Sequence, residues 1–114
     1  MISQVDIDDM YDIRDFQADS WQYALPTARS PEYLFTGLAG EVGEVCSLFA
    51  KAVRDGYNAD YKKQMVKELG DVAWFVASLC THVGVSFEEV LKANIEKLKD
   101  RAERNVISGS GNER

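Results

Sequence analysis

Apolar residues recur at intervals of three and four along most of the chain, the spacing that places them on one face of a helix. Alternation of apolar and polar residues, which is typical of half-buried strands, does not extend over a useful length. The pattern therefore predicts an all-α fold of four to five helices. The predicted helices run from Asp6 to Tyr23, from Pro31 to Asp55, from Asn58 or Asp60 to His82, and from Ser86 to about Arg104.

The predicted helix ends carry recognisable signals. The only two prolines lie in the segment LPTARSPEY, which we expect to be the principal loop. Ser30 and Pro31 suit the cap and the first position of the second helix. Gly56 would end that helix in a left-handed conformation, and Ser86-Phe-Glu-Glu89 has the pattern of a capping box.

Length and composition indicate one domain over residues 1–114, with residues 105–114 as a flexible Gly/Ser-rich tail. The net charge of −6 argues against a surface for nucleic acid polymers, because such a surface needs a basic patch. No signal peptide or membrane span is visible, so a cytoplasmic location is expected. Cys46 and Cys80 lack metal or redox spacing and are predicted to be buried free thiols.

Four acidic residues stand out because they form two pairs in apolar sequence: Glu41 with Glu44, and Glu68 with Asp71. Residues three apart lie on the same side of a helix, so each pair points in one direction. Converging carboxylates repel one another unless a cation neutralises them, and hard divalent cations such as Mg²⁺ prefer carboxylate oxygens. The pairs therefore predict a metal site.

A helical wheel places these acids relative to the expected core. Glu41 falls within the apolar arc of its helix and Glu44 at the edge of that arc. Glu68 lies near the centre of the inner face of the next helix, and Asp71 lies to one side. An ordinary surface role does not explain Glu41 or Glu68. Structural acids paired with Lys or Arg remain an alternative to a metal site.

The fourth predicted helix supplies candidate ligands for an anion. Asn94 falls within its apolar stripe, and Lys97 and Arg101 flank the same side. A lysine and an arginine beside an amide could hold phosphate oxygens, with a cationic edge that extends to solvent as the alternative. Lys51, two turns beyond Glu44, is either a phosphate ligand or a surface lysine.

The third predicted helix is apolar nearly all round, including Trp74 on the side away from the acids. Such a helix must be covered on more than one side, and a small four-helix chain can hardly do this alone. We therefore expect a homo-oligomer.

The ordered combination of Glu-x-x-Glu and Glu-x-x-Asp resembles that of the MazG-like all-α nucleoside triphosphate pyrophosphohydrolases. The segments GLAGEVGEVCSLFAK, KELGDVAWFVASLC, NIEKLKDR and ISGSGNER extend the resemblance over residues 16 to 114. Asn105 departs from the pattern, because relatives often have glycine there.

The resemblance implies a helical bundle completed by dimer or tetramer formation. It implies Mg²⁺, with Mn²⁺ as a substitute, held by the four acids, one of which would also activate water. The implied reaction cleaves a nucleoside triphosphate, here a dNTP by preference, between the α- and β-phosphates during house-cleaning of nucleotide pools. Carried over by position, the phosphates or sugar would contact Asn94, Lys97 and Arg101, and the base pocket would include Phe16, Gln17, Trp21 and Thr27.

Two alternatives stay open. One is an enzyme like phosphoribosyl-ATP pyrophosphohydrolase, which shares this kind of helical acid site. The other is a non-catalytic helical oligomer that uses the acids for metal-dependent assembly.

Overall fold

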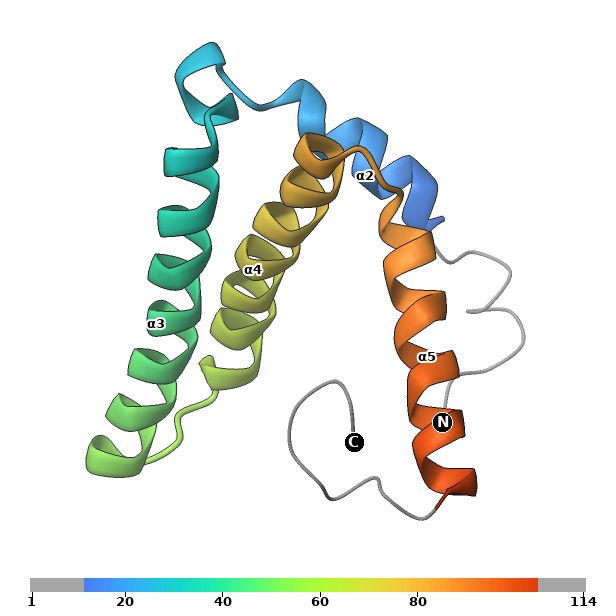
Figure 1. The fold of residues 1–114 in the computed structure, drawn as a ribbon. Helices are drawn as coiled ribbons and strands as arrows, with labels where there is room; N and C mark the ends of the chain where they lie inside the picture. Colours follow the sequence, from blue (N-terminus) through green and yellow to red (C-terminus); the bar gives the residue numbers. More distant parts are fainter. Residues whose placement is uncertain (1–11, 105–114) are drawn as a thin grey trace.

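The computed structural model describes residues 12–104, and Figure 1 shows their arrangement. No strand occurs in this part of the chain, so the all-α prediction is confirmed. The helical elements are α2 (Ile13–Gln22), a 3₁₀ turn η1 (Pro26–Arg29), α3 (Pro31–Asp55), α4 (Tyr61–Val83) and α5 (Phe87–Glu103).

The two longest helices, α3 and α4, lie side by side as an antiparallel hairpin (Figure 1). Their close approach depends on Gly37, because a Cβ atom at this position would collide with the ring of Phe75. The side chain of Leu34 is completely buried, and Ala52 is buried toward the other end of α3. The hairpin is therefore the framework to which the other helices attach.

The short helix α2 packs against α4. The indole Nε1 of Trp74 donates a hydrogen bond of 2.9 Å to the backbone oxygen of Ser20. Ala77, Ser78 and Cys80 in the C-terminal part of α4 are buried. Trp74, which the sequence placed away from the acids, thus joins α4 to α2.

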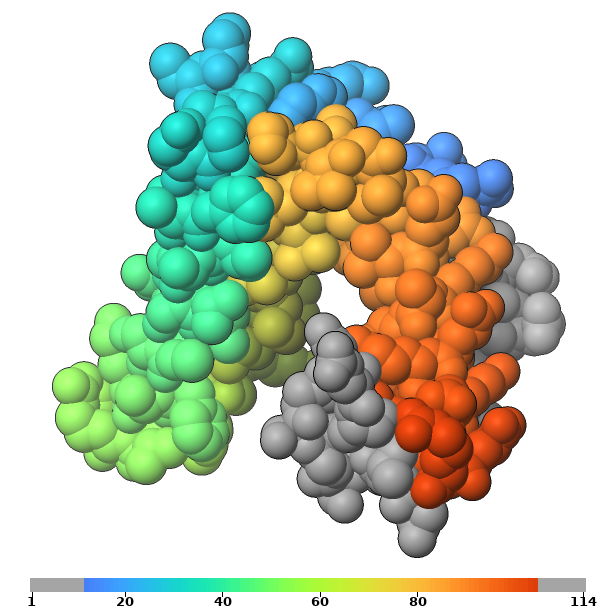
Figure 2. All heavy atoms as spheres, viewed as in Figure 1, coloured from blue at the N-terminus to red at the C-terminus, as the bar shows by residue number. Residues whose placement is uncertain are grey.

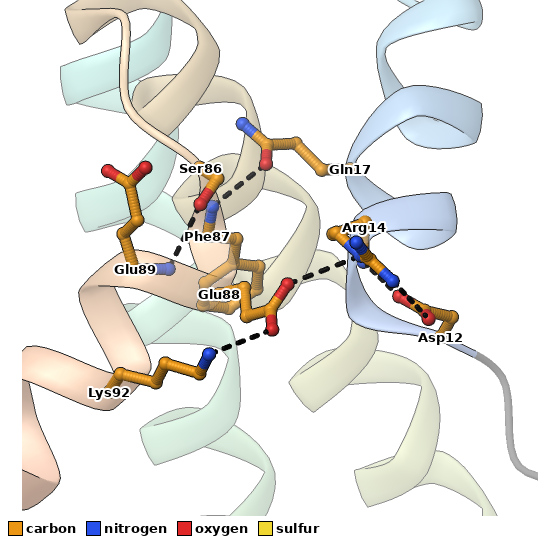
Figure 3. A network of polar contacts seen from close by, with 8 residues as sticks. All are labelled: Asp12, Arg14, Gln17, Ser86, Phe87, Glu88, Glu89 and Lys92. Atoms are coloured by element: carbon orange, nitrogen blue, oxygen red, sulfur yellow. Dashed lines mark hydrogen bonds and ion pairs between the residues drawn. The ribbon is translucent and has the colours of Figure 1, made fainter.

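Helix α5 leaves α4 at a sharp corner, and the two helices are bent by 100° relative to each other. Gly84 makes the turn with φ 90° and ψ 30°, a left-handed conformation that suits glycine. Figure 3 shows the contacts at this corner: Gln17 of α2 accepts a hydrogen bond from the backbone N–H of Phe87, and Glu88 lies between Arg14 and Lys92. These ion pairs are exposed and contribute little to stability.

Most predicted helix ends agree with the structure. Ser30 and Ser86 cap α3 and α5 by accepting bonds from backbone N–H groups three residues later. Gly56 follows α3 with a positive φ of 92°, although its ψ of 153° differs from the left-handed helical value. The predicted continuous helix from Asp6 to Tyr23 is wrong, because Asp12 is extended and caps a new helix through a 2.7 Å bond from the N–H of Arg14. Residues 6–11 and the predicted tail 105–114 lie outside the described part.

Several side chains predicted to be buried are exposed. Cys46 is exposed and only Cys80 is buried, where desolvation raises the pKa of the thiol. Asn94 is also exposed, because residues 12–104 leave the middle of the apolar stripe of α5 uncovered. Figure 2 shows α5 separated from the lower half of the hairpin in this view. Exposed stripe residues include Val90, Leu91 and Ile95.

Within residues 12–104, no single helix is both long and apolar enough to cross a membrane; α4 and α5 meet that test only when taken together across their bend.

Candidate metal centre

Three of the four predicted acids come together between α3 and α4. Glu41 of α3 and Glu68 and Asp71 of α4 each offer one carboxylate oxygen, and these oxygens all lie within 4.8 Å of one another. The antiparallel hairpin places the middle of α3 opposite the first half of α4, so residues 27 to 30 positions apart meet at one level. The hairpin therefore brings together acids from two helices, whereas the sequence shows only the pair within each helix.

The environment of these acids differs from that of ordinary surface carboxylates. Glu41 and Glu68 are half-buried, whereas Asp71 is exposed. Desolvation raises the pKa of Glu41 above its usual value, and the negative charges of Asp71, Glu68 and Glu44 raise it further. The cluster thus carries an electrostatic cost that a bound cation would relieve.

Glu44 lies differently. Its side chain is exposed and does not join the three-oxygen group, although its charge contributes to the raised pKa of Glu41. The structure therefore separates three converging acids from one at their margin.

The donor set fits a hard divalent cation. Three carboxylate groups supply oxygen ligands, and the exposed side at Asp71 leaves room for water or phosphate oxygens to complete the coordination. None of the ion pairs found among residues 12–104 includes any of the four acids. This observation favours a cation over the alternative of structural acids paired with Lys or Arg.

A cavity of about 180 Å³ lies at the loop end of the same hairpin. Lys51, one of its lining residues, follows Glu44 by seven positions on the same side of α3, which is about 10 Å along the helix axis. Gln64 enters from α4, one turn before Glu68. The full lining is Leu48, Lys51, Ala52, Asp55, Gly56, Asn58, Tyr61 and Gln64.

Of these lining residues, the sequence indicated only Lys51 as a candidate substrate ligand. Gln64 could have been found as well, because it precedes Glu68 by one helical turn and so shares a side of α4 with the acids. Asn58 could not, since its position depends on how the loop between the helices folds.

The predicted phosphate ligands of α5 occupy a separate helix. Asn94 is exposed, Lys97 is half-buried, and Arg101 is only 3% exposed. Lys97 and Arg101 both have interaction partners. No hydrogen bond or ion pair found within the described residues links them to the acids. Helix α5 packs against α2 and α4, and no contact found among residues 12–104 joins these three residues to the carboxylate group.

Two further predicted substrate ligands make contacts within the protein. The side-chain amide of Gln17 donates to Thr81 Oγ1 at 3.1 Å and to the backbone oxygen of Val85 at 3.0 Å. The ring of Trp21 lies 4.8 Å from the guanidinium carbon of Arg29, a cation–π arrangement. Both side chains therefore have a structural role in the fold.

Taken together, the fold and the site define an all-α protein whose central helical hairpin gathers carboxylates around a space suited to a divalent cation. The family model of the MazG nucleotide pyrophosphohydrolase domain matches residues 29–106, which include α3, α4 and α5. The chain therefore belongs to the MazG nucleotide pyrophosphohydrolase family.

Two relatives are similar over part of the chain. The Gene 37 protein of Mycobacterium phage L5 is 38% identical over 85 residues, which cover 72% of this chain and 75% of the relative. The uncharacterized protein YvdC of Bacillus subtilis (strain 168) is 40% identical over 50 residues, or 44% of this chain and 47% of the relative. No solved structure matches the chain.

Proposed function

We propose that this protein is an Mg²⁺-dependent nucleoside triphosphate pyrophosphohydrolase that cleaves a dNTP to a dNMP and pyrophosphate. The observation that carries the proposal is the meeting of carboxylate oxygens of Glu41, Glu68 and Asp71 within 4.8 Å, at a place where desolvation and then the neighbouring negative charges raise the pKa of Glu41. Membership of the MazG nucleotide pyrophosphohydrolase family supports the same reaction.

The three acids would hold the metal, with Mn²⁺ as a substitute for Mg²⁺. When bound, the metal supplies neutralisation of phosphate charge and activation of the attacking water. Phosphoryl transfer needs positioning and charge stabilisation more than a protein nucleophile. Glu44, at the margin of the group, is exposed and well placed to accept a proton from water.

The phosphates would extend from the acids toward cationic side chains. Lys51 lines the cavity on the same side of α3 as Glu44, at a reach that suits a phosphate chain. Lys97 and Arg101 lie on α5, which forms no part of the carboxylate group. We propose that the protein acts in the cytoplasm as a homo-oligomer, in which α5 of one protomer or its partner completes the site and stabilises the departing pyrophosphate.

A substrate screen tests this function directly. Purified protein with Mg²⁺ is incubated with each canonical and modified NTP and dNTP, and with phosphoribosyl-ATP, and pyrophosphate release is measured. We expect release from dNTPs in the presence of Mg²⁺ and none in the presence of a chelator. Preferential turnover of phosphoribosyl-ATP would identify the alternative enzyme.

A matched pair of variants connects the activity to the site. Glu68→Gln removes one converging carboxylate and is expected to abolish turnover, whereas Glu96→Gln changes an exposed acid of α5 outside the group. If Glu68→Gln retained full activity, the proposed site would be wrong. If the metal bound and no nucleotide were hydrolysed, the acids would serve assembly instead of catalysis.

A further inference from the structure

The cavity at the loop end of the hairpin, which we call the loop-end cavity, lies on the same side of both helices as the acids. Gln64 of α4 precedes Glu68 by one turn, about 6 Å along the helix axis. Lys51 of α3 follows Glu44 by two turns, about 10 Å along its axis. A ligand held at the metal centre can therefore extend along the hairpin into this cavity.

The size of the loop-end cavity suits one part of a nucleotide. Its volume is about 180 Å³. A site that encloses a whole drug-sized ligand measures roughly 300–1,000 Å³. A nucleoside triphosphate held by its phosphates at the acids would therefore place only one of its two ends here. That end is either the terminal phosphate or the base with its sugar.

The charges of the lining separate these two possibilities. Of the lining residues, Lys51 is cationic and Asp55 is anionic, so their charges cancel. The two carboxylate oxygens of Asp55 also accept hydrogen bonds of 2.8 and 2.6 Å from Arg54. A terminal phosphate in the cavity would lie close to this carboxylate, with a single lysine of the lining to balance it. An uncharged base meets no such repulsion, so the charges favour the base.

The remaining lining offers contacts that a base can use. Tyr61 supplies an aromatic ring, whose centroid lies 4.9 Å from that of Tyr57 in an edge-to-face arrangement at 90°. Stacking on an aromatic ring holds a base of any kind. The side-chain amide of Gln64 adds a donor and an acceptor for the edge of the base, and Leu48 and Ala52 contribute apolar surface.

Asn58 gives the lining a preference among bases. Its side-chain oxygen accepts a 2.9 Å hydrogen bond from the backbone N–H of Asp60 in the loop between α3 and α4. Among residues 12–104 no hydrogen bond was found from its side-chain nitrogen, which is therefore the group that it can offer to a ligand. An N–H donor pairs with a carbonyl oxygen. Guanine, thymine and uracil carry a carbonyl where adenine and cytosine carry an amino group.

We propose that the loop-end cavity binds the base of the nucleotide and that Asn58 selects a carbonyl over an amino group on its edge. The inference rests on the proposed function, because the metal centre is what holds the phosphates. The α-phosphate then lies between the acids and Lys51, and the departing pyrophosphate extends in the other direction. This subsite differs from the pocket that the family resemblance implies, where Gln17 and Trp21 make contacts within the fold.

Binding of nucleoside monophosphates tests the subsite without catalysis. Isothermal titration calorimetry in the presence of Mn²⁺ measures the affinity for two pairs of ligands, dUMP with dCMP and dGMP with dAMP. The members of each pair have nearly the same size and differ in carrying a carbonyl or an amino group. We expect the wild-type chain to bind the carbonyl member of at least one pair more tightly, by at least about fivefold.

A matched pair of variants assigns this preference to Asn58. Asn58→Asp keeps an oxygen for the N–H of Asp60 and replaces the amide nitrogen with a second acceptor, so the loop is retained. This variant is expected to lose or reverse the preference. Lys63→Gln is the control, because it makes the net charge more negative by the same amount at an exposed position outside the cavity lining. It should leave the preference unchanged, and circular dichroism verifies that both variants are folded.

A third variant tests the other amide of the lining. Gln64→Ala changes an exposed position of α4, where the helix tolerates alanine, and is expected to weaken binding of every monophosphate by at least about threefold. The affinity of this variant for Mn²⁺ alone should equal that of the wild type, because Gln64 is not among the converging acids.

Four results would overturn the proposal: no measurable binding of any monophosphate, equal affinities within both pairs, a preference that Asn58→Asp leaves unchanged, or a Gln64→Ala variant that binds like the wild type. Failure of the proposed function gives a different result. A chain that binds the monophosphates in the expected order but hydrolyses no triphosphate would keep the base subsite and lose the catalytic role.

Discussion

Gln17 in α2 accepts a hydrogen bond of 2.8 Å from the backbone N–H of Phe87, seventy residues later at the start of α5. Its amide nitrogen donates to Thr81 and to Val85, so one side chain joins α2, the end of α4 and the start of α5. The corner that sets the direction of α5 is thus fixed by a residue that sequence reasoning placed in the substrate pocket.

Replacing this side chain should weaken the corner. Gln17→Ala removes three hydrogen bonds and is expected to lower the free energy of unfolding by about 1–3 kcal/mol, measured by urea denaturation. Gln22→Ala, on an exposed position of the same helix, is the control and should change it by less than about 0.5 kcal/mol. An unchanged stability together with a raised KM for the nucleotide would instead support a role in substrate binding.

Gly37 and Gly40, one helical turn apart in α3, are expected to affect stability in opposite directions when each is replaced by alanine. Gly37→Ala is expected to destabilise the protein by about 1–3 kcal/mol, because the new methyl group collides with the buried ring of Phe75. Gly40→Ala meets open space and should stabilise the helix by up to about 1 kcal/mol. Thermal unfolding of the two variants under one condition checks both. Equal changes in the melting temperature would show that the close contact between Gly37 and Phe75 does not limit the stability of the hairpin.

Local features of the fold could be predicted from the sequence, whereas tertiary ones could not. Capping by Ser30 and Ser86 depends on residues three positions apart, so the first residues of α3 and α5 were predicted correctly. Phe49 follows the apolar spacing of α3 but is half exposed, because an apolar stripe does not reveal which molecule covers it. Whether it is covered by this chain or by a second copy is a tertiary question.

The site shows the same limit. Periodicity correctly directed Glu41 and Glu68 toward the inside of the hairpin, but it could not separate Glu44 from the converging group. That separation depends on the level at which two antiparallel helices meet. The predicted burial of Asn94 was wrong for a related reason. Helix α5 turns away from α4 at Gly84, so residues 12–104 leave the middle of its apolar stripe uncovered.

The metal centre predicts unequal roles for acids that look alike in sequence. Asp71→Asn removes a converging carboxylate and is expected to weaken Mn²⁺ or Mg²⁺ binding at least about tenfold, or about 1.4 kcal/mol. Glu44→Gln lies outside the three-oxygen group and should weaken binding less. Isothermal titration calorimetry without nucleotide measures both constants. Equal losses for the two variants would place Glu44 among the direct ligands.

The raised pKa of Glu41 predicts that pH affects the metal-free and metal-bound protein in opposite ways. Without metal, the folded state binds more protons than the unfolded state between the ordinary pKa of a glutamate and the raised one. Stability contributed at this site therefore falls as pH rises through that window. Metal binding needs the deprotonated acid, so the stabilisation by Mg²⁺ should increase over the same rise.

Comparing the wild-type protein with Glu41→Gln isolates this effect from other titrating groups. In a chelator, the melting temperature of wild type minus that of Glu41→Gln should become more negative as pH rises from about 4 to about 7. In saturating Mg²⁺, the same difference should become more positive, because only the wild type keeps the full set of ligands. A difference that does not change with pH in the chelator would mean that Glu41 titrates like an isolated surface acid, and the electrostatic reason for a cation at this place would disappear.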